Sequence, residues 1–248
     1  MNKKTLDNQK LVKAAVLGAI TIVLGLTPLG LIPLGVINAT TMHIPVIIAA
    51  IIEGPVVGAL VGLIFGLFSL VNAFVRPTPI AFAFYNPLIS ILPRILIGIT
   101  SYYAYKGAMK VSAKNSKTLS RILWILLIGV LLYLLIRNIA SGAELINIIF
   151  IILLLVVAIG LFIYTRKSKG LDFPIAIGAF VGSMTNSILV LGGIYLIYAE
   201  KYVAAVGIPL ESAKAAILGV IITSGLPEAM LSVIISTAVV KAVKKARR

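Results

Sequence analysis

The chain alternates long apolar runs with short polar or basic segments. After Lys13, no Lys, Arg, Asp or Glu occurs until Glu53, and comparable runs recur to the end of the chain. Most of these runs approach the ~20 apolar residues that a helix needs to cross a bilayer. Prolines and Gly-Pro turns divide them, because proline interrupts a helix. The pattern predicts eight membrane segments, near residues 10–27, 42–52, 55–72, 86–105, 122–136, 145–164, 173–199 and 212–240.

The composition is also typical of a membrane protein. Of the 248 residues, 60% are apolar and 12% are charged, whereas about a quarter of a soluble domain is charged. There is no Cys and only one His, which excludes thiolate and multi-histidine metal sites. No P-loop or H-E-x-x-H motif occurs. We expect an all-α integral membrane protein with one membrane domain over residues 1–248, no catalytic residues, no metal and no cofactor.

The basic residues lie between the apolar runs, so the net charge of +15 does not indicate a nucleic-acid partner. We place the N-terminus in the cytoplasm and alternate sides along the eight segments. Seventeen of the 22 Lys and Arg then fall inside, four fall outside, and Arg94 lies within a helix. By the positive-inside rule, this bias predicts a cell-membrane protein in the lipid bilayer with both termini cytoplasmic.

Polar residues inside apolar helices mark the candidate ligand site, because they are costly in hydrocarbon. Asn86 and Arg94 share one helix face. Asn186 lies midway along the predicted segment 173–199, and Glu228 lies in the last segment. One hypothesis is a pocket in the outer half of the bilayer. Arg94 would grip a carboxylate or phosphate, the asparagines would contact amide or hydroxyl groups, and Glu228 would accept from ligand donors. The alternative is a buried Arg94–Glu228 ion pair that fixes packing.

The remaining candidate binding residues lie beside the outer loops. A lone histidine is more often structural than a ligand contact, but its position keeps His43 in the set. Tyr85, with Phe82 and Phe84, would form either an aromatic lid or an interfacial belt. The candidates in this group are Asn38, Thr40, His43 and Tyr85.

Small residues recur every fourth position in two of the predicted helices. Glycines stand at 54, 58, 62 and 66, and Ala15 and Ala19 have the same spacing near the N-terminus. Such strips let another helix approach closely. They serve either internal packing or the docking of a partner membrane protein, for which the candidates are Ala15, Ala19, Gly58 and Gly62.

Several motifs resemble a known family. They are T-x-H-I-P-V-I-I, G-P-x-x-G-A, F-G-L-x-S and N-P-x-x-S-x-x-P-R-I-L-I-G, followed by GSMTNSILVLGGIYL and GLPEAMLSVIISTAVVKAVKK. They resemble the S components of energy-coupling factor (ECF) vitamin transporters. The resemblance covers about residues 10–110 and 172–245, and it is closest to the pantothenate-type branch.

The resemblance implies a six-helix S-component core with a vitamin site near the outer surface, capped by the loop at about Pro28–Thr41. It implies docking, through small residues such as Ala15 and Ala19, onto a membrane coupling subunit that works with two cytoplasmic ATPase subunits. Gly58 and Gly62 would be a second contact. The segment 118–168 departs from the family pattern, and its two apolar runs predict an inserted transmembrane hairpin.

These observations predict a substrate-binding subunit of an ECF-type importer that captures a small water-soluble vitamin, with pantothenate as the first guess. The alternative is a stand-alone channel or facilitator for a small anionic metabolite. The two differ in one measurable property, because only the first requires ATPase partners for transport.

Overall fold

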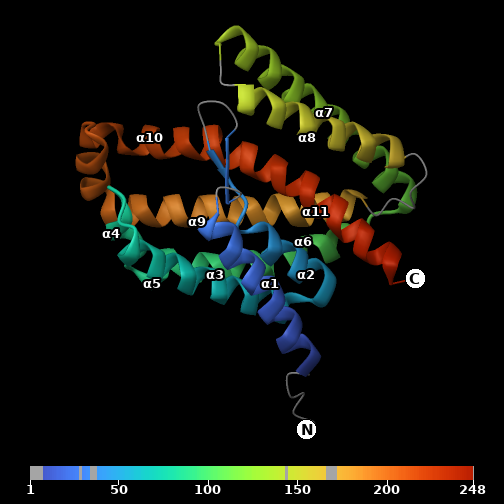
Figure 1. Ribbon diagram of the computed structural model, residues 1–248, viewed down its shortest axis with the longest axis horizontal. Helices are drawn as coiled ribbons and strands as arrows, with labels where there is room; N and C mark the ends of the chain where they lie inside the picture. The colour runs from blue at the N-terminus through green and yellow to red at the C-terminus, as the bar shows by residue number, and fades with distance from the viewer. Residues whose placement is uncertain (1–7, 28–29, 34–37, 143–144, 166–171, 248) are drawn as a thin grey trace.

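The computed structural model describes residues 8–27, 30–33, 38–142, 145–165 and 172–247 (Figure 1). The first seven residues, the basic patch at 166–171 and parts of the predicted capping loop lie outside the described residues. Within the described part, the regular secondary structure is helical apart from one small antiparallel hairpin of β1 (Leu31–Pro33) and β2 (Asn38–Thr40). The helices are α1 (Asn8–Leu26), α2 (Ile44–Glu53), α3 (Pro55–Val75), α4 (Ala81–Phe84), α5 (Pro87–Ser90), α6 (Leu92–Ala108), α7 (Ala113–Ala140), α8 (Leu145–Thr165), α9 (Asp172–Val206), α10 (Ala213–Val220) and α11 (Leu226–Ala246).

Six of the described helical stretches are long and apolar enough to cross a membrane. They are Asn8–Leu26, Pro55–Val75, Pro87–Ala108, Lys114–Ala140, Phe173–Val206 and Leu226–Ala246. The helical membrane class is therefore confirmed, but the predicted eight membrane segments are not. Helix α2 has only 10 residues, or about 15 Å at 1.5 Å per residue. The described apolar stretch of α8 is also short, at Ile151–Ile163.

Helix α2, which is shorter than the six spanning stretches, lies at the centre of the fold. Every residue from Ile44 to Ile51 is buried. The helix packs against α1, α3, α6, α9 and α11. A helix that is apolar on all sides is stable only when neighbours surround it. This explains why a segment too short to cross a bilayer forms the core.

The glycine strip of α3 is an internal packing surface, which corrects the expectation that it docks a partner. Gly58 lies against Ala50 of α2 and Gly98 of α6. A side chain at Gly62 would clash with the backbone of α6 at Arg94. Both glycines are buried, because small residues let the helix backbones approach within contact. The strip therefore fixes where α6 presents Arg94.

The small residues of α1 divide between two faces. Ala14 and Gly18 are buried, and Gly18 packs against Ile64 of α3. Ala15 and Ala19 lie on the exposed face of the same helix. That face is available to a partner in a way that Gly58 and Gly62 are not.

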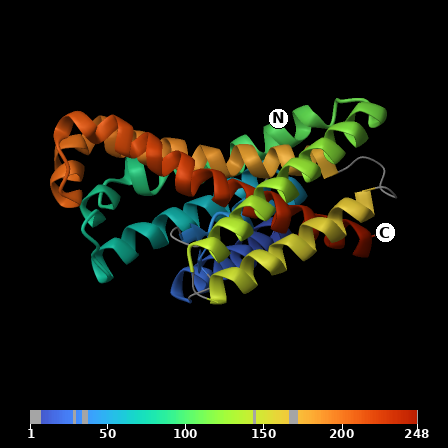
Figure 2. The ribbon, with the colours of Figure 1, turned by 90° about the horizontal axis from the view of Figure 1, so that it is seen from above.

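Helices α7 and α8 form an antiparallel pair along one side of the molecule (Figures 1 and 2). The pair packs on α9 through α7 and on α11 through α8, and Trp124 is fully buried. Helix α7 begins well before the predicted start of its apolar run, because the Ser112 side chain caps its polar first turn by accepting from the Asn115 N–H.

The last predicted segment is one continuous helical stretch that contains a π-helical turn. A π-helical turn, η3 (Ile221–Gly225), separates α10 from α11, and Pro227 stands in the first turn of α11. The predicted loop over residues 73–85 likewise contains the short helix α4. Turns of π type often occur at functional sites, and both departures from the prediction lie beside the pocket described below.

Candidate functional site

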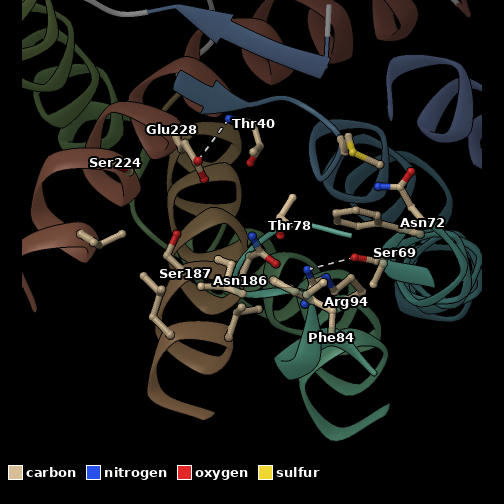
Figure 3. A pocket seen from close by; sticks show the side chains of 18 of the residues that line it. Thr40, Ser69, Asn72, Thr78, Phe84, Arg94, Asn186, Ser187, Ser224 and Glu228 are labelled. Carbon is tan, nitrogen blue, oxygen red and sulfur yellow. Dashed lines mark hydrogen bonds between the residues drawn. The ribbon is translucent and has the colours of Figure 1, made fainter. Parts of the chain in front are cut away.

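A pocket of about 440 Å³ opens between β2, the end of α3, the start of α6, the middle of α9 and the η3–α11 junction (Figure 3). This volume is in the range of small-molecule sites. Its wall is mostly apolar and includes Phe65 and Phe84. Its polar lining residues are Thr40, Ser69, Asn72, Arg76, Thr78, Arg94, Asn186, Ser187, Ser224 and Glu228.

Arg94 is held rigidly in this wall. Its side chain is 5% exposed, and its guanidinium donates to the Ile89 carbonyl oxygen and to Ser69 Oγ, the latter at 3.4 Å. The rings of Phe65 and Phe84 lie 5.2 and 5.4 Å from its Cζ atom. Nε makes no hydrogen bond within the described residues. A buried cation with unused donors favours an anionic ligand group.

Glu228 faces the same pocket from α11. Its Oε1 accepts from the backbone N–H of Thr40 at 3.1 Å. Within the described residues it makes no ion pair with Arg94, and the ion pairs found there join Glu53 to Lys13 and Arg247. The alternative of an Arg94–Glu228 pair that fixes packing is therefore not what the structure shows.

Asn186 lies between the two charges (Figure 3). It projects from α9, and its Oδ1 has no hydrogen-bond partner in the described part of the chain. A buried amide oxygen without a partner costs free energy, so a ligand donor would satisfy it. The pocket thus presents a cation, an amide and a carboxylate in this spatial order, from Arg94 through Asn186 to Glu228.

Three predicted binding residues with described side chains do not line the pocket. His43 is fully buried, with Nε2 2.6 Å from Ser232 Oγ. Tyr85 is 40% exposed and stacks on Phe74 with ring centroids 4.3 Å apart. Asn86 caps α5 by accepting from the Leu88 N–H. Asn38, a fourth candidate, lies in β2, and its side chain falls outside the described part.

Helix α3 contributes two lining residues that were not among the predicted binding residues. Ser69 and Asn72 line the pocket from the last turns of this helix. They are three residues apart in an otherwise apolar segment, which places them on one face. That spacing was the available signal. Thr78, in the following connection, has no comparable signal because it sits in a loop.

The pocket lies at one end of the helices. Helix α3 begins beside Glu53 and ends at the pocket, whereas α6 and α11 begin at the pocket. The far ends of these helices carry Lys106, Lys244 and Arg247. Glu53 accepts there from Lys13 at 2.8 Å and from Arg247 at 2.5 Å. The ligand site and the basic end are therefore separated by the length of the helices.

The fold and the site together define a multi-pass membrane protein with a pocket lined by polar side chains at one end. Residues 9–137 match the family described as the ECF transporter, substrate-specific component. The chain belongs to this family, whose members are components of transporters and not enzymes. It is also similar to the pantothenic acid transporter PanT of Lactococcus lactis subsp. cremoris (strain MG1363). The two are 29% identical over 226 residues, which covers 85% of this chain and 80% of the relative.

Proposed function

We propose that this chain is the substrate-binding subunit of an ECF-type importer and that its ligand is pantothenate. The observation that carries the proposal is the order of groups across the pocket, from Arg94 through Asn186 to Glu228. The printed name of the relative, a pantothenic acid transporter, supports the same ligand.

The chemistry of pantothenate matches this order. The molecule carries a carboxylate at one end, an amide in the middle and hydroxyl groups at the other end. Arg94 supplies a charge-assisted donor for the carboxylate. The unpaired Oδ1 of Asn186 accepts from the amide N–H, and the Glu228 carboxylate accepts from a hydroxyl group. The apolar wall formed by residues such as Phe65 covers the methyl groups of the ligand.

The orientation follows from the charge distribution. The pocket opens outside the cell, and the opposite end, with its Lys and Arg residues, faces the cytoplasm together with both termini. The α7–α8 pair, which covers most of the predicted insertion at 118–168, is a transmembrane hairpin inserted into a six-helix core. With α2 embedded at the centre, this gives eight membrane segments in a single domain.

Transport requires partners in this proposal. The exposed face of α1, with Ala15 and Ala19, docks on a membrane coupling subunit, and two cytoplasmic ATPase subunits drive ligand release on the inside. Ligand and partners must bind the outward and inward states with different affinities, because only differential binding shifts such an equilibrium.

Two measurements test the function. Calorimetric titration of the purified protein with pantothenate should give saturable binding, and Arg94→Ala should lower the affinity at least tenfold. Uptake into liposomes should need the coupling and ATPase subunits as well as ATP. Uptake by the chain alone would instead favour a facilitator, and a protein that does not bind pantothenate would refute the assigned ligand.

A further inference from the structure

One face of α3 forms a wall of the pocket. Its lining residues recur at intervals of three or four positions, which places them on one side of the helix. They are Phe65, Ser69, Asn72, Ala73 and Arg76. Phe65 is buried, Ser69 and Asn72 are half-buried, and Arg76 is exposed. Figure 3 shows Ser69 and Asn72 pointing into the pocket. This face therefore leads from the buried part of the pocket to its mouth.

Two cations stand at the two ends of this path. The buried Arg94 donates to Ser69 Oγ at 3.4 Å, which places its guanidinium beside the inner part of the wall. Arg76 is the C-cap of α3, seven residues beyond Ser69, or about 10 Å at 1.5 Å per residue. No other Lys or Arg lines the pocket in the part of the chain that the structure describes. An anion that enters through the mouth meets Arg76 first and Arg94 second.

The Arg76 side chain has no partner among the described residues. The ion pairs found there both use Glu53, and the guanidinium hydrogen bonds belong to Arg94 and Arg247. A cation is favoured at the C-terminus of a helix by the helix dipole. The dipole accounts for a cation at this position, but it does not require the side chain to line the pocket. The Arg76 guanidinium is therefore available to an anion from solution.

The different burial of the two cations suits them to different steps of binding. An exposed charge acts on a solvated anion over about 10 Å at 0.1 M salt, and a cleft with low-dielectric walls focuses such a field and speeds association. Arg76 meets these conditions, because it is exposed at a pocket whose wall is mostly apolar. Arg94, at 5% exposure, can hold a carboxylate only after the anion has left bulk water.

We propose that Arg76 is a capture residue, which attracts the ligand carboxylate to the mouth and delivers it along the Asn72–Ser69 face of α3 to Arg94. Arg76 then sets the association rate, and Arg94 sets the dissociation rate. The proposal rests on the proposed function in one respect, that the captured anion is the transported ligand. The preference of the mouth for anions is a property of the ligand-free protein, so it can be tested separately.

The first test measures this preference without a ligand. Because the chain contains no Cys, Ser224→Cys places a single thiol on the far wall of the pocket, on η3. The thiol is modified with two methanethiosulfonate reagents, one carrying a sulfonate and one a trimethylammonium group. Arg76→Gln should lower the ratio of the anionic to the cationic reaction rate severalfold, and Arg76→Lys should restore it.

A matched control removes the same charge elsewhere. Arg137 is an exposed arginine in the last turn of α7 that does not line the pocket. Arg137→Gln changes the net charge as Arg76→Gln does, so any effect of total charge is common to both. The ratio should stay at its wild-type value in Arg137→Gln. If Arg76→Gln also leaves the ratio unchanged, or lowers it no more than Arg137→Gln does, Arg76 does not capture anions.

The second test is kinetic and uses pantothenate. In stopped-flow measurements at low salt, Arg76→Gln should lower the association rate about threefold, a modest share of the tenfold or greater gain that a charged cleft can give. The difference should vanish at high salt, because screening removes steering. The dissociation rate should stay unchanged in Arg76→Gln and rise in Arg94→Ala, whose lost contact belongs to the bound state.

The kinetic outcomes separate capture from other roles. A raised dissociation rate in Arg76→Gln with an unchanged association rate would place Arg76 on the bound ligand and overturn the capture role. Equal rates in Arg76→Gln and wild type, with equal melting temperatures, would overturn it as well. If wild type fails to bind pantothenate, the assigned ligand is wrong, and the reagent ratios alone decide whether Arg76 captures anions.

Discussion

Arg94 and Glu228 face one pocket from α6 and α11, yet in the described part of the chain they form no ion pair with each other. Each charge contacts neutral groups instead: Arg94 donates to a backbone carbonyl and to Ser69, and Glu228 accepts from the Thr40 N–H. Buried charges without counter-ions are costly. The pocket therefore keeps a positive and a negative group available at separate positions, which favours a ligand with an anionic end and a hydrogen-bond-donating end.

The first prediction concerns the anionic end. Arg94→Ala should lower the affinity for pantothenate at least tenfold, because a charge-assisted hydrogen bond is worth about 1.5–3 kcal/mol. The protein should remain folded, since the guanidinium forms no ion pair that would be left half-complete. Calorimetry gives the affinity, and size-exclusion chromatography gives the folded fraction.

Conservative variants sharpen this test. Arg94→Lys keeps the charge but cannot reproduce the fork of donors, so its affinity should also fall. Ser69→Ala removes only a long hydrogen bond of 3.4 Å and should change the affinity by less than Arg94→Lys does. Undiminished binding in Arg94→Ala would assign Arg94 to packing.

The second prediction separates two asparagines that the sequence treats alike. Asn186 lines the pocket, so Asn186→Ala should weaken pantothenate binding. Asn86 caps α5, so Asn86→Ala should cost about 1 kcal/mol of stability and leave the affinity within about twofold, well under the 1.4 kcal/mol of a tenfold change. Titration and thermal melting of both variants check this, and a larger affinity loss in Asn86→Ala than in Asn186→Ala would contradict the site.

The helices and the polar residues inside them were predictable because the cost of exposing polar groups to hydrocarbon leaves a pattern in the sequence. Arg94, Asn186 and Glu228 stand out against apolar neighbours, and all three line the pocket. Helix boundaries shift mainly where a capping side chain extends a helix, as Ser112 does for α7. Both outcomes depend on local sequence.

What could not be predicted depends on helix rotation and loop path. The spacing places Asn86 and Arg94 on one face of a single helix. The structure instead has two helices, α5 and α6, and Asn86 is the N-cap of α5. His43 follows the lining residues Thr40 and Met42 in the sequence, yet its side chain contacts Ser232 instead of lining the pocket. Thr78 reaches the pocket through a connection whose path no periodicity encodes.

The third prediction concerns the glycine strip. Gly62→Ala should destabilise the protein by about 1–3 kcal/mol, the usual cost of overpacking, because the new methyl group meets the backbone of Arg94. It should also weaken ligand binding, since it displaces that segment of α6. Gly107→Ala is the control, because Gly107 has open space around its α-carbon. Equal melting temperatures for the two variants would show that α3 and α6 are not closely packed.

The fourth prediction concerns the partner surface. Ala15→Glu places a charge on the exposed face of α1, so it should abolish ATP-dependent uptake while leaving pantothenate binding intact. Ala15→Ser keeps a small side chain and should preserve both activities. Uptake is measured in liposomes with the coupling and ATPase subunits, and binding is measured on the isolated chain. Full uptake by Ala15→Glu would place the docking surface elsewhere.

The last prediction concerns the basic end, where Glu53 at the end of α2 holds Lys13 of α1 and Arg247 beyond α11. Glu53 lies outside the six spanning helices. Burial alone would raise the pKa of Glu53, but the hydrogen bonds and positive charges of Lys13 and Arg247 outweigh it and lower the pKa below its ordinary value. A carboxylate with a lowered folded-state pKa contributes stability above its unfolded pKa and loses it as the pH falls through the folded value.

Glu53→Gln should therefore lower the melting temperature at pH 7, by an amount that corresponds to about 1 kcal/mol or less because both cations are partly exposed. The difference from wild type should shrink as the pH falls below the ordinary carboxyl pKa of 4.5. High salt should shrink it as well, since screening weakens exposed charge pairs. Glu211→Gln, an exposed carboxylate with no ion pair in the described part of the chain, serves as the control. A stability difference for Glu53→Gln that is the same at pH 7 and pH 4 would show that the carboxylate charge does not hold the two terminal helices together.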